Sequence, residues 1–352
     1  MALLYILLIV GFSGLIFQRS KLVTILIFVF TWTLMWNTKT PDFSAYKSIY
    51  TLNEFRDGGY SVLCSLGRYL GLSFYQFYLV LGAISYIIYC RFTMKYDDRC
   101  SLVASLYLLV ISYFDIVQFR NFVAFSIVLL AIPKLFSDKR SDIIKYCVTV
   151  VLASSIHVTM LFYLVFPFMN KDVFRLENIK QYLLPLLLLI VCMYFGVSMF
   201  EERVSNISEN YDKGVSTATK LGIVMLLAGN IAYISYWTKK KPVIQLSYPQ
   251  YVLSENTKQQ VLFFNVAMVL LFPIAVKSLT IFRLYKYIGL INFAFVSNKF
   301  VAPGNLRIIP QTIIITLYGL TYLGLFFYIH WVQFIPYVML PLLTRNLFWT
   351  FL

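Results

Sequence analysis

Residues 101–136 read SLVASLYLLVISYFDIVQFRNFVAFSIVLLAIPKLF, two long apolar runs separated by a short polar break. The runs, 101–114 and 121–136, each approach the length that a helix needs to cross the hydrocarbon core of a membrane. They are continuously apolar, whereas a strand of a membrane barrel would alternate apolar and polar residues. Because backbone groups in lipid must be paired within their own segment, this stretch predicts two transmembrane helices joined by a tight turn.

Similar apolar runs recur along the whole chain. They cover residues 2–17, 21–36, 74–90, 182–200, 219–237, 259–276 and 310–328. The 352 residues are 60% hydrophobic and only 13% charged, which is far more apolar than a soluble domain. We therefore predict an all-α, polytopic transmembrane helical bundle of about 11 full spans that forms a single domain over residues 1–352.

The net charge of +15 is distributed over short loops between the apolar runs. In such loops lysine and arginine set the orientation of the protein in the membrane, so the charge does not indicate a nucleic-acid partner. The most basic short loops are 134–145 and 238–241, and we expect both on the cytoplasmic side. This orientation places the longest polar segments, 37–73 and 201–218, on the outer side.

Residues 143–169 conflict with this orientation if they form one span, because the basic loops that follow would then lie on the wrong side. The conflict disappears if the segment is a pair of half-helices that enters from the cytoplasm and returns, breaking at Ser154, Ser155 and His157. The alternative is one long tilted helix that departs from the charge rule. We favour the half-helix pair.

Cysteine and histidine patterns give no support for a bound metal. The five cysteines have no paired spacing, and the two histidines belong to no metal-binding motif. The sequence therefore predicts neither a metal site nor a cofactor.

Polar side chains from separate parts of the chain converge on the predicted outer membrane level. The charged ones are Arg68, Arg120, Arg203, Arg283, His157 and Asp42, and the polar ones beside them are Gln118, Tyr46, Tyr60 and Tyr211. Arginine forks suit phosphate or pyrophosphate, and tyrosines suit sugar rings. Taken singly, each signal has a structural explanation: an interfacial aromatic belt, an Arg120 paired with Asp115, or a His157 bonded within the core.

Several of these residues form an ordered set of motifs. A D-x-x-x-Y element at Asp42 and Tyr46 is followed by Asp57, Gly59 and Tyr60, then by Q-x-R-N at 118–121, the basic loop 134–145 and His157. In this order they resemble the EpsG/Wzy-like family of bacterial polysaccharide polymerases. The resemblance covers roughly residues 30–170 and thins afterwards to an R-L-x-x-Y element at 283–287.

The resemblance implies a GT-C-like glycosyltransferase that polymerises oligosaccharide repeat units carried on undecaprenyl pyrophosphate. The reaction would take place at the outer, periplasmic face of the bacterial inner membrane, in O-antigen (lipopolysaccharide) or capsule assembly, without a metal. The implied partners are the lipid-linked oligosaccharides, membrane lipids and a chain-length regulator protein.

Roles follow for the candidate residues under this reading. Arg120 and Arg283 would bind pyrophosphate, with Arg68 and Arg203 as second contributors. Either His157 or Asp42 would deprotonate the acceptor hydroxyl, and we favour His157 slightly.

Two other classes remain open from the sequence. A flippase or transporter for the lipid-linked unit would also line a cavity with arginines, although its expected repeated halves are not visible here. Another lipid-linked transferase, such as an O-antigen ligase, would use the same donor, although a ligase normally carries a larger outer loop late in the chain.

Overall fold

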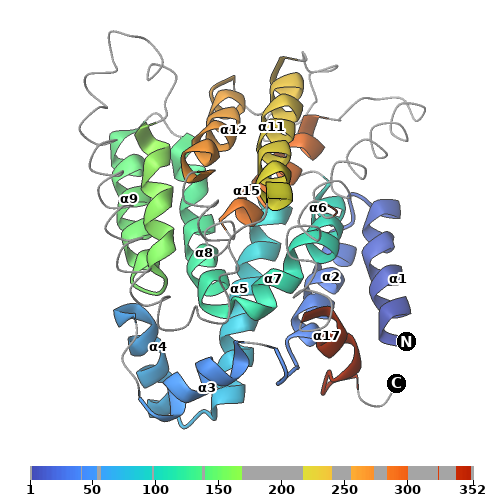
Figure 1. The fold of residues 1–352 in the computed structure, drawn as a ribbon, viewed down its shortest axis with the longest axis vertical. Coiled ribbons are helices and arrows are strands. Elements are labelled where there is room, and N and C mark those ends of the chain that lie inside the picture. The colour runs from blue at the N-terminus through green and yellow to red at the C-terminus, as the bar shows by residue number, and fades with distance from the viewer. Residues whose placement is uncertain are drawn as a thin grey trace.

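The computed structural model describes residues 2–40, 42–53, 57–96, 99–136, 139–168, 217–239, 255–272, 284–299, 324 and 338–349. Every regular element in these ranges is a helix, and the only extended pairing among them is a single bridge between Asn37 and Asn346. The predicted all-α class is therefore confirmed (Figure 1).

The first half of the chain builds the centre of the bundle. The helices of this centre are α1 (Ala2–Ile16), α2 (Lys21–Leu34), α5 (Phe74–Tyr96), α6 (Cys100–Leu106), the π-turn η1 (Tyr107–Ile111), α7 (Ser112–Val117) and α8 (Phe119–Ala131). Among the described residues, three stretches are long and apolar enough to cross a membrane: Phe74–Lys95, Cys100–Val117 and Thr217–Tyr236. The total number of spans stays a prediction.

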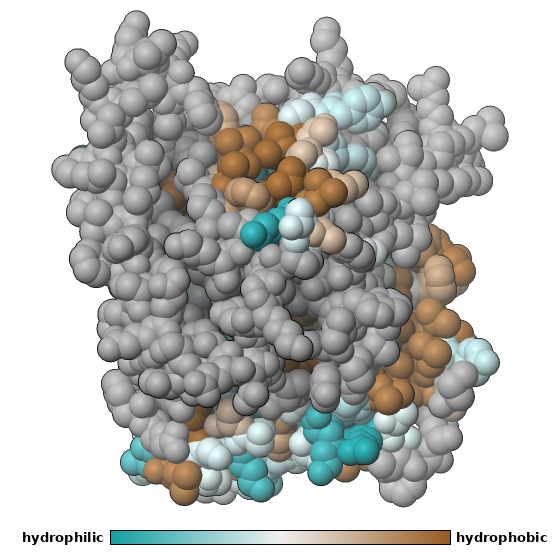
Figure 2. Space-filling view, viewed as in Figure 1, coloured by the Kyte–Doolittle hydropathy of each residue, from teal (hydrophilic) through white to brown (hydrophobic). Residues whose placement is uncertain are grey.

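The distribution of apolar side chains is that of a protein solvated by lipid. On α1 and α2 the side chains of Ile9 and Leu22 are 68% and 66% exposed. Figure 2 shows apolar surface where α1 lies, at the right of the view. Inside the bundle, by contrast, the hydroxyls of Ser105, Ser112 and Ser126 are buried. Lipid accepts the outward apolar face, and the buried Ser126 hydroxyl of α8 donates to the Ser85 hydroxyl of α5 at 3.3 Å.

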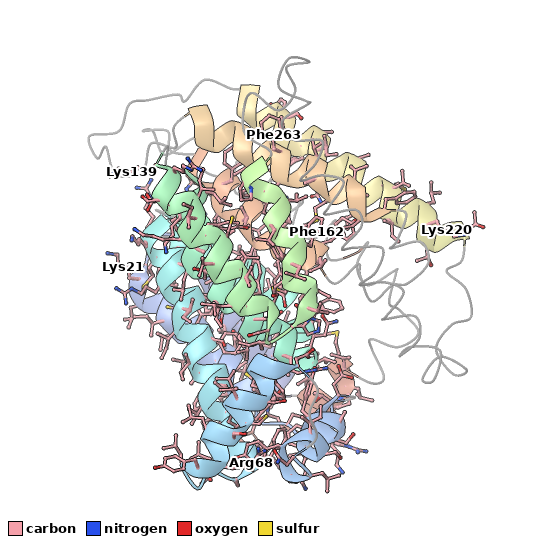
Figure 3. All side chains as sticks on the ribbon, turned by 90° about the vertical axis from the view of Figure 1, so that its left-hand side faces the viewer. Lys21, Arg68, Lys139, Phe162, Lys220 and Phe263 are labelled. Carbon is pink, nitrogen blue, oxygen red and sulfur yellow. The ribbon has the colours of Figure 1, made fainter. Side chains whose placement is uncertain are left out.

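Two short helices cover one end of the bundle. They are α3 (Phe43–Thr51) and α4 (Gly58–Tyr69), and both belong to the predicted outer segment 37–73. Aromatic residues fix them to α5: the Phe43 ring lies 5.2 Å from Phe74, and the Tyr50 ring lies 4.9 Å from Phe77. Figure 3 shows Arg68 at this end and Lys139, of the basic loop 134–145, toward the opposite end, which agrees with the predicted orientation.

Residues 140–168 form a helical hairpin. The helix α9 (Arg140–Ser154) ends at a turn, and the 3-10 helix η3 (Val158–Phe168) returns beside it. The Tyr146 hydroxyl donates to the Tyr163 carbonyl across the pair, at 2.8 Å. The break therefore falls at the predicted position, and a single long helix is excluded. Its entry from the cytoplasm stays a prediction.

The cause of this break is local. The hydroxyls of Ser154 and Ser155 each donate to a carbonyl three residues earlier, at 2.7 Å. These side-chain bonds compete with the helical pattern, so two adjacent serines favour an end to the helix.

The later helices described are α11 (Thr217–Lys239), α12 (Glu255–Ala267), the 3-10 turn η5 (Met268–Leu271), α15 (Tyr285–Lys299) and α17 (Leu340–Thr344). The side-chain amides of Asn265 in α12 and Asn292 in α15 donate to each other, at 2.8 Å in both directions. Three candidate residues, Arg203, Tyr211 and Arg283, lie outside the described residues, as does most of the segment 201–218.

Candidate functional site

The site is built around the break between α7 and α8. The helix α7 ends at Val117, Gln118 leaves the helical conformation with φ −93° and ψ 55°, and α8 starts at Phe119. The tight turn predicted from the polar break is therefore confirmed. It places Arg120 in the first turn of α8.

Arg120 is held by three side chains from the outer segment. Its Nη1 lies 2.5 Å from Oδ2 of Asp57. Its guanidinium carbon lies 5.6 Å from the ring centre of Tyr46 and equally 5.6 Å from that of Tyr60. Both distances suit a cation–π contact. The α3 and α4 helices thus form a cage over the start of α8, with one carboxylate and two aromatic rings around one cation.

The tyrosines of this cage are buried. Tyr46 is 7% exposed and Tyr60 is fully buried. Burial raises the pKa of Tyr60 well above its usual value, so its phenol carries a proton at physiological pH. Tyr60 can therefore contribute its ring face to the cage but cannot act as a base.

Asp42 lies one helical turn before Tyr46. It occupies the N-cap position of α3, and its carbonyl accepts from the Tyr46 N–H at 3.0 Å. Side chains four residues apart share one face of a helix, so the D-x-x-x-Y spacing puts Asp42 on the same side of α3 as Tyr46. Asp42 is half-buried there.

The hairpin turn that carries His157 docks on the start of α4. The Gly59 N–H donates to the Ser155 carbonyl at 2.8 Å. The approach is so close that a Cβ added to Gly59 would lie 2.2 Å from the Ser155 Oγ. Asp57 and His157 are each two residues from this bond, so the structure brings the histidine to the same end of α4 as the Arg120 cage. Its Nδ1 contacts the Thr159 hydroxyl at 2.7 Å.

A buried charge pair lies next to the cage. The Lys286 ammonium of α15 is 2.6 Å from Oδ1 of Asp115 in α7, and their side chains are 1% and 0% exposed. The same ammonium donates to Gln118 at 3.1 Å, and Tyr107 donates to Asp115 at 2.7 Å. The alternative in which Asp115 pairs with Arg120 is therefore wrong, because Asp115 pairs with Lys286 and Arg120 pairs with Asp57.

Arg68 lies apart from this cage. Its guanidinium donates to the Tyr50 carbonyl at 2.8 Å and to the Ser65 hydroxyl at 2.9 Å, which fastens α4 to the end of α3. Asp57 precedes the first turn of α4 and Arg68 lies in its last, so the two are roughly 16 Å apart along the helix at 1.5 Å per residue.

Sequence reasoning thus identified the members of the cage but not its ion pair. Arg120, Tyr46 and Tyr60 come together as a group, with the His157 turn beside them. Asp57 belonged to the same motif set, but the motif did not name it as the partner of Arg120, and Lys286 was visible only as a charge next to an apolar run. In the part of the chain that the structure describes, no group of three or more His, Cys, Asp or Glu side chains is arranged to hold a metal ion.

Comparison with known proteins agrees with the motifs. Neither a curated protein nor a solved structure matches the chain. The sequence model of the EpsG family matches residues 19–339, nearly the whole chain, so the likeness extends well beyond the region in which the motifs are dense. This protein belongs to the EpsG family, a Wzy-like family of polysaccharide polymerases.

Proposed function

We propose that this protein joins oligosaccharide repeat units carried on undecaprenyl pyrophosphate, at the outer face of the bacterial inner membrane, to make O-antigen or capsule polysaccharide. A hydroxyl of one lipid-linked unit attacks the anomeric carbon of the growing chain. A new glycosidic bond forms, the bond to the pyrophosphate breaks, and the hydroxyl proton passes to a base. Family membership supports the polymerase activity, and the site supports the choice of leaving group.

The observation that carries this proposal is the Arg120 cage. A departing pyrophosphate needs positive charge that is already in place, because charge fixed before the reaction stabilises the transition state without reorganisation. The two tyrosine rings hold the guanidinium at 5.6 Å on each side and leave its fork as the binding group. A guanidinium can bind two phosphate oxygens at once and stays protonated in a partly dry site.

The base in this proposal is His157, with Asp42 as the alternative. An imidazole can take a hydroxyl proton near neutral pH. The docking of Ser155 on Gly59 brings His157 to the end of α4 that holds Arg120, and Asp42 lies at the start of α3, one helical turn before Tyr46. Arg283 and Arg203 would add to the binding of pyrophosphate. Because arginines supply the cationic charge, the reaction requires no metal.

The test is to express Arg120→Ala and Arg120→Lys in a deletion strain and to compare the length of the surface polysaccharide. Arg120→Ala should display single repeat units without a ladder, and Arg120→Lys should recover little, because an ammonium does not reproduce the fork. The matched control is Arg140→Ala, an exposed arginine of α9, which should give the full ladder.

Two results would contradict the proposal. A normal ladder with Arg120→Ala would remove this residue from the site. A deletion strain that displays no repeat unit at all would favour a flippase, because a polymerase is needed only after the first unit has crossed the membrane.

A further inference from the structure

Asp57 occupies a position on Arg120 at which an anionic ligand would bind. The two side chains are only 23% and 21% exposed, and their charged atoms are 2.5 Å apart. A guanidinium so far removed from water is costly without an anionic partner. When no phosphate is present, some carboxylate must therefore balance Arg120, and Asp57 does so.

Because the Asp57 carboxylate contacts Arg120, it does not cap its own helix, which would be a second favourable position. It is the N-cap residue of α4, with extended backbone at φ −109° and ψ 131°, and aspartate is among the preferred N-cap residues. Its carboxylate nevertheless makes no capping bond and turns to Arg120 instead. A carboxylate is also stabilised by the dipole at a helix start. Asp57 thus has two stable places, on Arg120 or on the start of its own helix.

Arg120 has unused capacity for another anion. Within the described part of the chain, its Nε makes no hydrogen bond, although that atom is buried. One carboxylate oxygen on Nη1 therefore leaves the fork partly occupied. A pyrophosphate, which offers several oxygens, could bind the Nε and Nη2 edge and also replace the Asp57 oxygen on Nη1.

We infer that Asp57 is a built-in counter-ion of Arg120 that a lipid-linked pyrophosphate displaces on binding and that returns when the lipid leaves. No covalent bond changes in this exchange. A phosphate oxygen replaces Oδ2 of Asp57 on the guanidinium, and the carboxylate moves to the start of α4. Asp57 is a positioning residue that sets how tightly the site holds substrate and product. The inference rests on the proposed role of Arg120 in binding pyrophosphate.

The test is to measure the Kd of undecaprenyl pyrophosphate for the purified full-length protein and its variants. Asp57→Asn keeps the shape and removes the competing charge, so it should bind the lipid about threefold to fivefold more tightly, as expected for a partly exposed ion pair. Arg120→Gln should lose most of the affinity. The matched control is Asp142→Asn, which removes a carboxylate that is 25% exposed and pairs with the exposed Lys145 on α9, and it should leave the Kd unchanged.

The outcomes separate this inference from the proposed function. An unchanged or weaker affinity in Asp57→Asn, together with a loss in Arg120→Gln, overturns the counter-ion alone. Wild-type affinity in Arg120→Gln overturns the role of Arg120 and the counter-ion with it.

A second measurement covers the case in which Asp57→Asn is poorly stable. Its thermal unfolding temperature should then rise with added inorganic pyrophosphate, and by more than that of the wild type, because the added anion replaces the missing carboxylate. Equal responses of the two proteins would overturn the inference. Asp142→Asn should respond like the wild type.

Discussion

The chemistry of the cage depends on an arginine at position 120 in particular. Two rings at 5.6 Å stack well on a flat guanidinium and leave its edge for an anion. An ammonium group is compact and strongly hydrated, and it would gain less from the same rings. At the residue scale the cage thus favours arginine over lysine at position 120. The proposed proton acceptor, His157, lies outside the cage.

His157 is the residue that we expect to accept this proton. We predict that His157→Gln lowers the polymerisation rate by about 10²-fold or more, the usual contribution of a general base, whereas Asp42→Asn has a small effect. Thr159→Val should give an intermediate loss, because its hydroxyl contacts Nδ1 of the ring at 2.7 Å and orients it. The measurement is ladder formation from lipid-linked units by the purified variants. A near-normal rate in His157→Gln and a large loss in Asp42→Asn would transfer the role to Asp42.

At the scale of elements, a buried charge pair joins α15 to the start of α8. The Lys286 ammonium contacts Asp115 at 2.6 Å and Gln118 at 3.1 Å, and Gln118 is the hinge residue two positions before Arg120. A shift of α15 would therefore be passed to the cage through this hinge. Although α15 contributes no side chain to the cage, this pair would let α15 influence the geometry of the cage.

We predict that Lys286→Met and Asp115→Asn each destabilise the protein by about 3 kcal/mol, because each leaves one buried charge unpaired. The double variant should recover much of this loss, since removing both charges leaves none to balance. Thermal unfolding in detergent measures the effect, and the partly exposed pair Asp142–Lys145 supplies the control variants. Single variants as stable as the wild type would show that the pair does not hold the two helices together.

Helix breaks were easier to predict from the sequence than the partners of charged side chains, and the reason is physical. The break at Gln118 and the hairpin turn at Ser154–His157 have local causes, polar residues between apolar runs, so both were predictable. Asp57 and Arg120 are 63 positions apart, and their pairing depends on how α4 packs on α5 and α9. Charge alone made Asp115 an equally good partner for Arg120, and only packing distinguishes the two carboxylates.

At the scale of the whole molecule, the ends of the bundle match the expected sides of a membrane. The outer helices α3 and α4 lie at one end, and Figure 3 shows Lys139 toward the other. The loop before α2 contacts the start of α6, where the Ser101 N–H donates to the Gln18 carbonyl at 3.1 Å. Because the outer segment 37–73 follows α2 and spans alternate in direction, both loops are expected on the cytoplasmic side, and their contact is consistent with one shared side.

The hairpin of α9 and η3 provides the sharpest prediction at this scale. Its arms have 15 and 11 residues. At about 1.5 Å per residue for an α-helix and about 2.0 Å for a 3-10 helix, each arm rises roughly 22 Å. The hydrocarbon core is about 30 Å thick, so α9 and the described part of the returning arm are each too short to cross it. The turn would then stop about 8 Å below the outer surface, at the depth where α4 meets it.

We therefore predict that positions on both sides of the hairpin face the cytoplasm. In a cysteine-free background, Lys139→Cys and Lys180→Cys should react with a membrane-impermeant maleimide only after the cells are permeabilised. Tyr69→Cys of α4, which replaces a residue that is 87% exposed, and Thr217→Cys at the start of α11 should react in intact cells. Labelling of Lys180→Cys from outside, with Lys139→Cys still protected, would mean that the segment crosses the membrane. The turn at His157 would then lie near mid-membrane, too far from the outer leaflet for this histidine to serve a lipid-linked sugar.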